Sequence, residues 1–120
     1  MAEMKLGVVE SKFADIIWEN EPITTAELIA LCSEQLEWKR TTTYTVLKRL
    51  CERGIFQNID SVVSSKISRE TFYSIQSEKF VEETVAGSLP AFFAAFTSRK
   101  KLSSKEIDEI RRMIDQYEGE

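Results

Sequence analysis

The sequence contains no histidine, and its 120 residues include only two cysteines, four glycines and two prolines. Histidine is the commonest general base and the commonest metal ligand, so its absence argues against most hydrolytic and metal-dependent active sites. Two cysteines alone do not complete a metal site. We therefore expect Cys32 and Cys51 to be reduced thiols packed as small apolar groups, and we expect neither a metal nor a cofactor.

Long apolar runs are also missing. No stretch approaches the ~20 apolar residues that a membrane-spanning helix needs. The first residues, "MAEMKLGVVESKF", lack the long apolar segment of a secretory signal peptide. We expect a cytoplasmic protein without membrane partners, in a compartment where thiols stay reduced.

The acidic residues do not suggest an active site. Glu82 and Glu83 are adjacent in the sequence, as are Asp108 and Glu109. Adjacent side chains diverge around a helix and do not converge on a substrate. Because the chain also lacks a glycine-rich phosphate loop, we predict that it is not an enzyme.

Charge is unevenly distributed in this acidic chain, whose net charge is −4. Residues 103–120 contain six acidic and three basic residues, whereas residues 39–53 contain a single acid, Glu52. The basic residues of the second segment are Lys39, Arg40, Lys48, Arg49 and Arg53. Local charge decides whether a surface meets nucleic acid, so residues 39–53 are the candidate interface.

Two helices are predicted before this basic segment. Residues 8–19 show helical apolar spacing, with one stripe formed by Val9, Phe13, Ile16 and Ile17. A second helix is expected to begin beside Thr24, because Thr24 and Glu27 have the spacing of a capping box. Its buried side is expected to comprise Ala26, Ile29 and Ala30, with Leu28 and Cys32 beside them.

The third predicted helix, residues 41–53, ends at Gly54 and completes a helix-turn-helix pattern. The period then changes. Residues 55–68 and 70–76 are rich in β-branched and aromatic residues, which predicts a β-hairpin with "SRE" as its turn. Such a hairpin after a helix-turn-helix is called a wing.

Residues 77–120 return to helical patterns. Ser88 with Pro90, and Ser103 with Glu106, predict two helix starts. The stretch "LPAFFAAF" is too apolar to be covered from one side, which favours a second copy of the chain as its partner. We predict a mainly α (α+β) fold, with a winged helix-turn-helix domain over residues 1–76 and a helical dimerisation domain over residues 77–120. The candidate dimer contacts are Phe80, Leu89, Phe92, Phe93, Phe96, Ile107, Ile110 and Ile114.

A helical wheel divides the basic helix into two faces. Thr43, Val46, Leu47 and Leu50 form the predicted core face, where the Thr43 hydroxyl needs a partner such as the carbonyl one turn back. Exposure to solvent would be enough to explain the charged residues of the outer face. A merely solvent-exposed face, however, favours Glu, Lys or Ala over a cluster of threonines. Hydroxyl groups form hydrogen bonds with base edges and phosphates, and basic side chains contact phosphates. The candidate DNA contacts are Arg40, Thr41, Thr42, Tyr44, Thr45, Lys48 and Arg49.

Four further residues have two interpretations. Lys66 and Arg69, on the predicted hairpin, are equally compatible with phosphate contact and with solvent exposure. Trp18 and Trp38 suit the core or an interface better than base stacking, because readout of a duplex does not require stacking.

The segments "LGVVESKFADIIWE" and "WKRTTTYTVLKRLCERGI", followed by "GSLPAFFAAF" and "KLSSKEIDEIRRMI", resemble in order and spacing the BlaI/MecI/CopY family of winged-helix penicillinase repressors. The resemblance covers about residues 6–117. It implies a homodimeric repressor that binds palindromic DNA operators with TACA/TGTA-like half-sites. It also implies release by a sensor-protease pathway, with Thr42, Tyr44 and Thr45 near base edges and Arg40, Lys48 and Arg49 on the backbone.

The chain departs from this family at several positions. Ser11 stands where the family usually has Trp, and Thr43 replaces an apolar residue. The segment 54–73 is about six residues longer than the family's wing. The family's scissile Asn-Phe bond aligns with Ala95-Phe96, and the Cys-x-Cys motifs of the copper-responsive branch are missing.

The alternative function is a winged-helix module for protein–protein interaction, which would suit the acidic pI.

Overall fold

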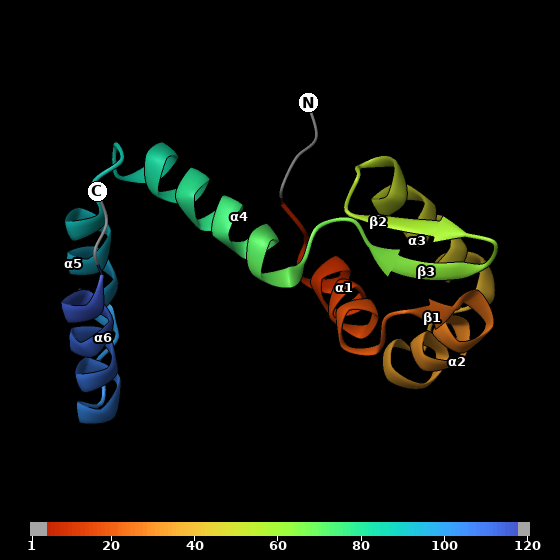
Figure 1. Cartoon of the computed structure of the whole chain (residues 1–120), viewed down its shortest axis with the longest axis horizontal. Helices are drawn as coiled ribbons and strands as arrows, with labels where there is room; N and C mark the ends of the chain where they lie inside the picture. The colour runs from red at the N-terminus through yellow and green to blue at the C-terminus, as the bar shows by residue number, and fades with distance from the viewer. Residues whose placement is uncertain (1–4, 118–120) are drawn as a thin grey trace. The chain divides into compact units, whose positions relative to one another are not determined.

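The computed structural model describes residues 5–117, and contacts divide the chain after Glu78 into two compact units. The first unit holds three complete helices, a small sheet and the first part of a fourth helix, and the second holds the rest of that helix and the last two helices (Figure 1). Helix α4 (Arg69–Thr84) runs through the predicted domain boundary between residues 76 and 77. The exact boundary therefore stays a prediction.

Helix α1 (Val8–Asn20) and helix α2 (Thr25–Leu36) form as the sequence predicts. Phe13, Ile16 and Ile17 are buried, whereas Val9 at the start of the stripe is exposed. At the start of α2, Thr24 Oγ1 accepts a hydrogen bond from the Glu27 N–H at 3.1 Å, and the Glu27 carboxylate accepts one from the Thr24 N–H at 3.1 Å. The predicted capping box is therefore confirmed.

The predicted buried side of α2 is partly wrong. The residues that α2 buries are Thr25, Leu28 and Cys32, while Ala26 and Ala30 are exposed and Ile29 is half-buried. An alanine side chain offers little apolar area, so burying the larger Leu28 contributes more free energy than burying Ala26 or Ala30.

Helix α3 (Arg40–Glu52) buries Thr43, Val46, Leu47 and Leu50, as predicted. The Thr43 hydroxyl donates to the carbonyl oxygen of Lys39 at 3.2 Å, one turn back. The helix ends beside Gly54, whose φ of 83° lies in the region that glycine adopts most easily. The helix-turn-helix is therefore confirmed in both its packing and its ends.

A three-stranded antiparallel sheet completes the first unit. Its strands are β1 (Ile23–Thr24), β2 (Phe56–Ile59) and β3 (Val62–Ser65), in the order β1-β3-β2. In this register, Ile23 pairs with Val63, and Phe56 pairs with Ser65. Together with the three helices, the sheet confirms the winged helix-turn-helix fold (Figure 1).

The predicted hairpin is too long, and its second strand is wrong. The turn lies at Asp60 and Ser61, and residues 70–76 form the beginning of helix α4. The Ser68 hydroxyl accepts a hydrogen bond from the Thr71 N–H at 3.1 Å, which satisfies a donor in the first turn of the helix. Phe72 is fully buried. Local capping and tertiary burial therefore outweigh the β propensity of "TFY".

Trp18 connects helix α1 to the segment that precedes α4. Its indole Nε1 donates to the carbonyl oxygen of Ile67 at 3.1 Å. Its ring centroid lies 5.3 Å from that of Phe56 and 5.7 Å from that of Phe72. Trp38 stacks on Phe13 with centroids 5.3 Å apart. Both tryptophans therefore pack against the core, as predicted.

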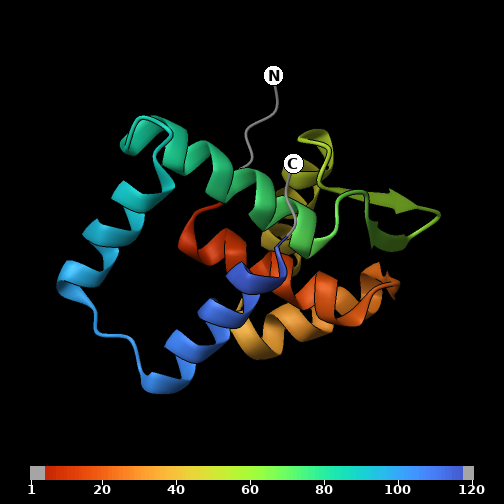
Figure 2. The same ribbon diagram turned by 60° about the vertical axis from the view of Figure 1, so that its left-hand side comes forward.

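The second unit contains the end of α4, helix α5 (Leu89–Arg99) and helix α6 (Ser104–Gln116). Figure 2 shows α5 and α6 as separate helices joined by a short extended segment. The predicted caps are confirmed, since Ser88 Oγ accepts from the Ala91 N–H and Ser103 Oγ accepts from the Glu106 N–H, each at 3.1 Å. None of the side chains in α5 or α6 is fully buried.

Candidate nucleic-acid interface

The outer face of α3 carries the predicted DNA contacts. The structure exposes Arg40, Thr41, Thr42, Tyr44, Thr45, Lys48 and Arg49 on this helix. The four buried residues of the same helix hold it against α2 and the sheet. A single helix therefore presents hydroxyl and basic groups on a rigid support.

The Thr45 hydroxyl is already engaged within the helix. It donates to the carbonyl oxygen of Thr41 at 2.9 Å. A hydroxyl has one donor and two acceptor lone pairs, so Thr45 offers an acceptor and a methyl group to any partner outside. This combination matches an amino group and a thymine methyl at a base edge.

The first turn of α3 is open to an anion. The side chain of Lys39 makes no capping hydrogen bond there, and the turn contains no acidic residue. Its backbone N–H groups and the positive end of the helix dipole favour a phosphate at this position. The Arg40 guanidinium lies 5.7 Å from the ring centroid of Tyr44, which restricts where Arg40 points.

Arg49 pairs with an acid that the sequence interpretation did not include. Its Nη1 atom lies 3.1 Å from Oε2 of Glu10 on α1, and Nη1 of Arg53 lies 3.7 Å from Oε1 of the same carboxylate. The hydrogen bond from the Gly7 N–H, together with the two arginines, lowers the pKa of Glu10. Only the fold brings residues 10 and 49 together, so sequence spacing offered no signal for this pair.

The two predicted contacts after Gly54 separate in the structure. Lys66 is exposed directly after β3, and its backbone N–H donates to the carbonyl oxygen of Ile55 at 2.8 Å. Arg69 does not lie on the hairpin: it opens α4 and pairs with Asp15 at 3.0 Å and Glu19 at 3.2 Å. Its guanidinium also lies 5.7 Å from the ring centroid of Trp18. Arg69 therefore has structural partners, and we leave it out of the proposed interface.

The tip of the hairpin carries no basic residue. Ile59 and Val62 are exposed on either side of Asp60 and Ser61. The Ser61 carbonyl oxygen accepts a hydrogen bond from the Thr25 N–H at 3.0 Å, which ties the turn to the start of α2. The tip thus offers no positive charge to a phosphate backbone. Within the hairpin region, Lys66 at its base remains the candidate for a phosphate contact.

The two thiols lie apart from this face. Cys32 is fully buried and Cys51 is half-buried. Burial raises the pKa of Cys32 to about 11, so its thiol stays protonated at neutral pH. Residues 5–117 contain no cluster of three or more potential metal ligands, and none of their helices has the length and apolar character of a membrane span.

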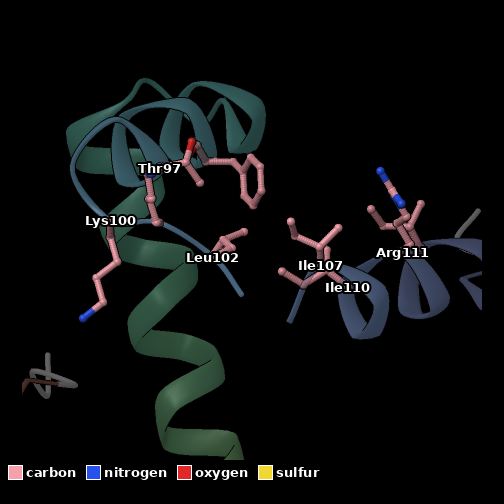
Figure 3. A pocket seen from close by; sticks show the side chains of 9 residues that line it. Thr97, Lys100, Leu102, Ile107, Ile110 and Arg111 are labelled. Atoms are coloured by element: carbon pink, nitrogen blue, oxygen red, sulfur yellow. The ribbon is translucent and has the colours of Figure 1, made fainter. Parts of the chain in front are cut away.

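The second unit has an apolar groove of about 550 Å³ between α5 and α6. Leu102, in the segment between α5 and α6, points into it, as do Ile107 and Ile110 from α6, whereas Lys100 points away (Figure 3). Of the predicted dimer contacts, Phe80, Leu89, Phe93, Phe96 and Ile114 are exposed, while Phe92, Ile107 and Ile110 are half-buried. Much apolar surface in this unit is therefore open to a partner.

The predicted cleavage position lies within α5. Ala95 and Phe96 are both exposed, and both belong to the regular helix. The ring of Phe96 stacks on that of Phe92 with centroids 6.3 Å apart.

Comparison with known proteins gives one consistent result. A family model described as penicillinase repressor matches residues 6–116. The penicillinase repressor of Bacillus licheniformis is 24% identical over 119 residues, which cover 96% of this chain and 93% of that protein. The methicillin resistance regulatory protein MecI of Staphylococcus aureus (strain Mu50 / ATCC 700699) is 25% identical over 120 residues, covering 92% and 94%. The penicillinase repressor of Staphylococcus aureus is 20% identical over 117 residues, covering 94% and 93%.

Proposed function

Because this chain belongs to the penicillinase repressor family, a family of transcriptional repressors, we propose that it represses transcription by binding double-stranded DNA through helix α3. The observation that carries this proposal is the division of α3 into two faces. Four residues anchor the helix in the core, and its outer face presents hydroxyl and basic groups. The major groove of B-DNA is wide enough to accept such a helix.

Each exposed residue has a proposed role. Thr42, Tyr44 and Thr45 face base edges or nearby phosphates. Arg40, Lys48 and Arg49 hold the phosphate backbone and set the register, as backbone contacts do in most protein–DNA complexes. Thr41 lies in the first turn, where the N–H groups attract a phosphate. Lys66 adds a backbone contact at the base of the wing.

The repressor acts as a homodimer in this proposal. Residues 1–76 form the DNA-binding domain, and residues 77–120 form the dimerisation domain. The apolar groove and the exposed phenylalanines of the second unit support this, because a second copy is the partner that is always present. A two-fold dimer requires a palindromic operator, and TACA/TGTA-like half-sites are the proposed targets.

Release from DNA is proposed to follow a sensor-protease pathway that acts at Ala95-Phe96. The two residues are exposed, which supports access, but they lie in a regular helix. Proteases bind extended chain, so α5 has to unwind locally before cleavage. In this proposal the repressor acts in the cytoplasm, needs no cofactor and catalyses no reaction.

The test is fluorescence anisotropy with two labelled duplexes, one with the palindromic half-sites and one with the same bases scrambled. We expect tighter binding to the palindrome. We also expect a linear fall of log K with log salt, with a slope of about −0.9 for each phosphate contacted. Binding that ignores sequence, or that lacks this salt dependence, would contradict the proposal. No binding to either duplex would favour the protein-interaction alternative.

A further inference from the structure

The ion pair between Glu10 and Arg49 connects the start of α1 to the outer face of α3. Glu10 lies in the first turn of α1, and Arg49 lies in the last turn of α3. Oε2 of Glu10 is 3.1 Å from Nη1 of Arg49. A proposed phosphate contact is thus already held by a carboxylate of the same chain.

The members of this cluster differ in exposure. The side chain of Arg49 is 53% exposed, whereas those of Glu10 and Arg53 are 22% and 21% exposed. Glu10 is also fixed by the Gly7 N–H, which donates to its Oε1 at 3.2 Å, and Arg53 donates to the carbonyl oxygen of Lys5. Arg49 is therefore the member that can turn outward while the other two stay in place.

Arg53 still compensates the negative charge of the Glu10 carboxylate after Arg49 has turned away. Its Nη1 lies 3.7 Å from Oε1, on the carboxylate oxygen that Arg49 does not contact. When Arg49 turns to an outside anion, Glu10 keeps one cation and one backbone hydrogen bond. Because the Arg49 side of this pair faces solvent, the pair is partly screened and contributes little, so a phosphate can displace the carboxylate.

Building on the proposed DNA-binding function, we propose that Glu10 is a positioning residue that competes with the DNA phosphate for Arg49. In the free protein Arg49 lies against Glu10. In the complex it moves to a phosphate oxygen, and Arg53 alone compensates Glu10. Every complex bears the cost of breaking this pair, so Glu10 lowers the affinity for any duplex without reading its sequence.

The alternative is that Glu10 only stabilises the start of α1. The variant Glu10→Gln separates the two roles, because an amide oxygen still accepts a hydrogen bond from the Gly7 N–H. The amide carries no charge and holds Arg49 weakly. A purely structural role predicts that Glu10→Gln changes thermal stability without raising DNA affinity.

The experiment measures the Kd for the scrambled duplex with wild type, Glu10→Gln, Arg49→Ala and the double variant. We expect Glu10→Gln to bind about threefold to fivefold tighter for each helix α3 engaged, which corresponds to one exposed ion pair. In the Arg49→Ala background the same change should have almost no effect. Glu34→Gln, which removes an exposed carboxylate from α2 rather than from the helix that carries Arg49, controls for general charge: its effect should persist without Arg49.

The outcomes are distinguishable. If the wild type shows no salt-dependent duplex binding, the proposed function fails, and the role of Glu10 fails with it. If the wild type binds but Glu10→Gln binds equally or more weakly, only the competition is refuted. A gain that survives in the Arg49→Ala background would also refute it, because it would come from net charge alone. Thermal unfolding of all variants excludes misfolding as the cause.

Discussion

The hydroxyl of Thr45 donates a hydrogen bond to the carbonyl oxygen of Thr41 at 2.9 Å, one turn earlier in α3. This bond decides which groups Thr45 presents on the outer face of the helix. Its donor is used within the helix, so the exposed Thr45 side chain still offers an acceptor lone pair and a methyl group. The proposed reader of base edges is therefore an acceptor with a small apolar surface.

The first prediction concerns this acceptor. We expect Thr45→Val, which keeps the shape and loses the oxygen, to weaken binding to the palindromic duplex about fivefold, corresponding to about 1 kcal/mol for one hydrogen bond. Binding to the scrambled duplex should stay unchanged, and Thr45→Ser should retain most of the preference. Anisotropy titrations check this. Equal weakening on both duplexes would mean that Thr45 does not read bases.

Lys48 is expected to act through charge alone. Lys48→Ala should weaken binding to both duplexes by the same factor and flatten the salt slope by about 0.9, the contribution of one phosphate contact. Titrations at several salt concentrations measure this slope. Lys105→Ala removes an exposed lysine from α6 in the other unit and should leave the slope unchanged. An unaltered slope in Lys48→Ala would place this side chain away from phosphate.

The buried Thr43 allows a test of stability without a change in the outer face. Its hydroxyl is satisfied by the Lys39 carbonyl oxygen, which also accepts the Thr43 N–H at 3.0 Å. Thr43→Val keeps the volume and leaves that carbonyl with a partner, so the free energy of unfolding should change by less than about 1 kcal/mol. Thr43→Ala leaves a small cavity and should destabilise more. Urea denaturation gives the free energy of unfolding of both variants. A larger loss of stability in Thr43→Val than in Thr43→Ala would contradict this account.

Trp18 is predicted to matter more for stability than Trp38. Trp18→Phe removes the hydrogen bond to Ile67 and leaves its carbonyl oxygen without that donor, at a cost of about 1–3 kcal/mol. Trp38→Phe keeps a ring beside Phe13, and the hydrogen bonds found among residues 5–117 include none from the Trp38 indole nitrogen. Thermal and urea unfolding compare the two variants. A larger loss from Trp38→Phe would show that the indole hydrogen bond contributes little.

The proposed dimer depends on the groove between α5 and α6. Ile110 points into this groove (Figure 3), so Ile110→Glu would bury a charge in the interface. An unpaired buried charge costs far more than an exposed one, so we expect a monomer in sedimentation velocity at micromolar concentration. Gln116→Glu adds the same charge to α6 outside the groove and should remain a dimer. A wild-type monomer would refute the dimer outright.

Much of the fold could be predicted from local sequence patterns, namely capping pairs and the periodicity of apolar residues. The capping pairs Thr24–Glu27 and Ser103–Glu106 mark their helix starts correctly, because both partners lie within one turn. The core face of α3 follows from its period of 3.6 residues. The predicted extent of the hairpin was wrong because "TFY" has β propensity, whereas the cap at Ser68 and the burial of Phe72 against Trp18 select a helix there.

The sequence by itself determined the helix-turn-helix and the outer face of α3, because these depend on spacing within short segments. The family was indicated by the resemblance of its motifs to known repressors. Only the tertiary structure decided which of the basic residues stay available. It placed Arg69 against Asp15 and Glu19, and it placed Arg49 against Glu10. These partners lie far apart along the chain, and an ion pair acts over a few ångströms in space, so no sequence period records it.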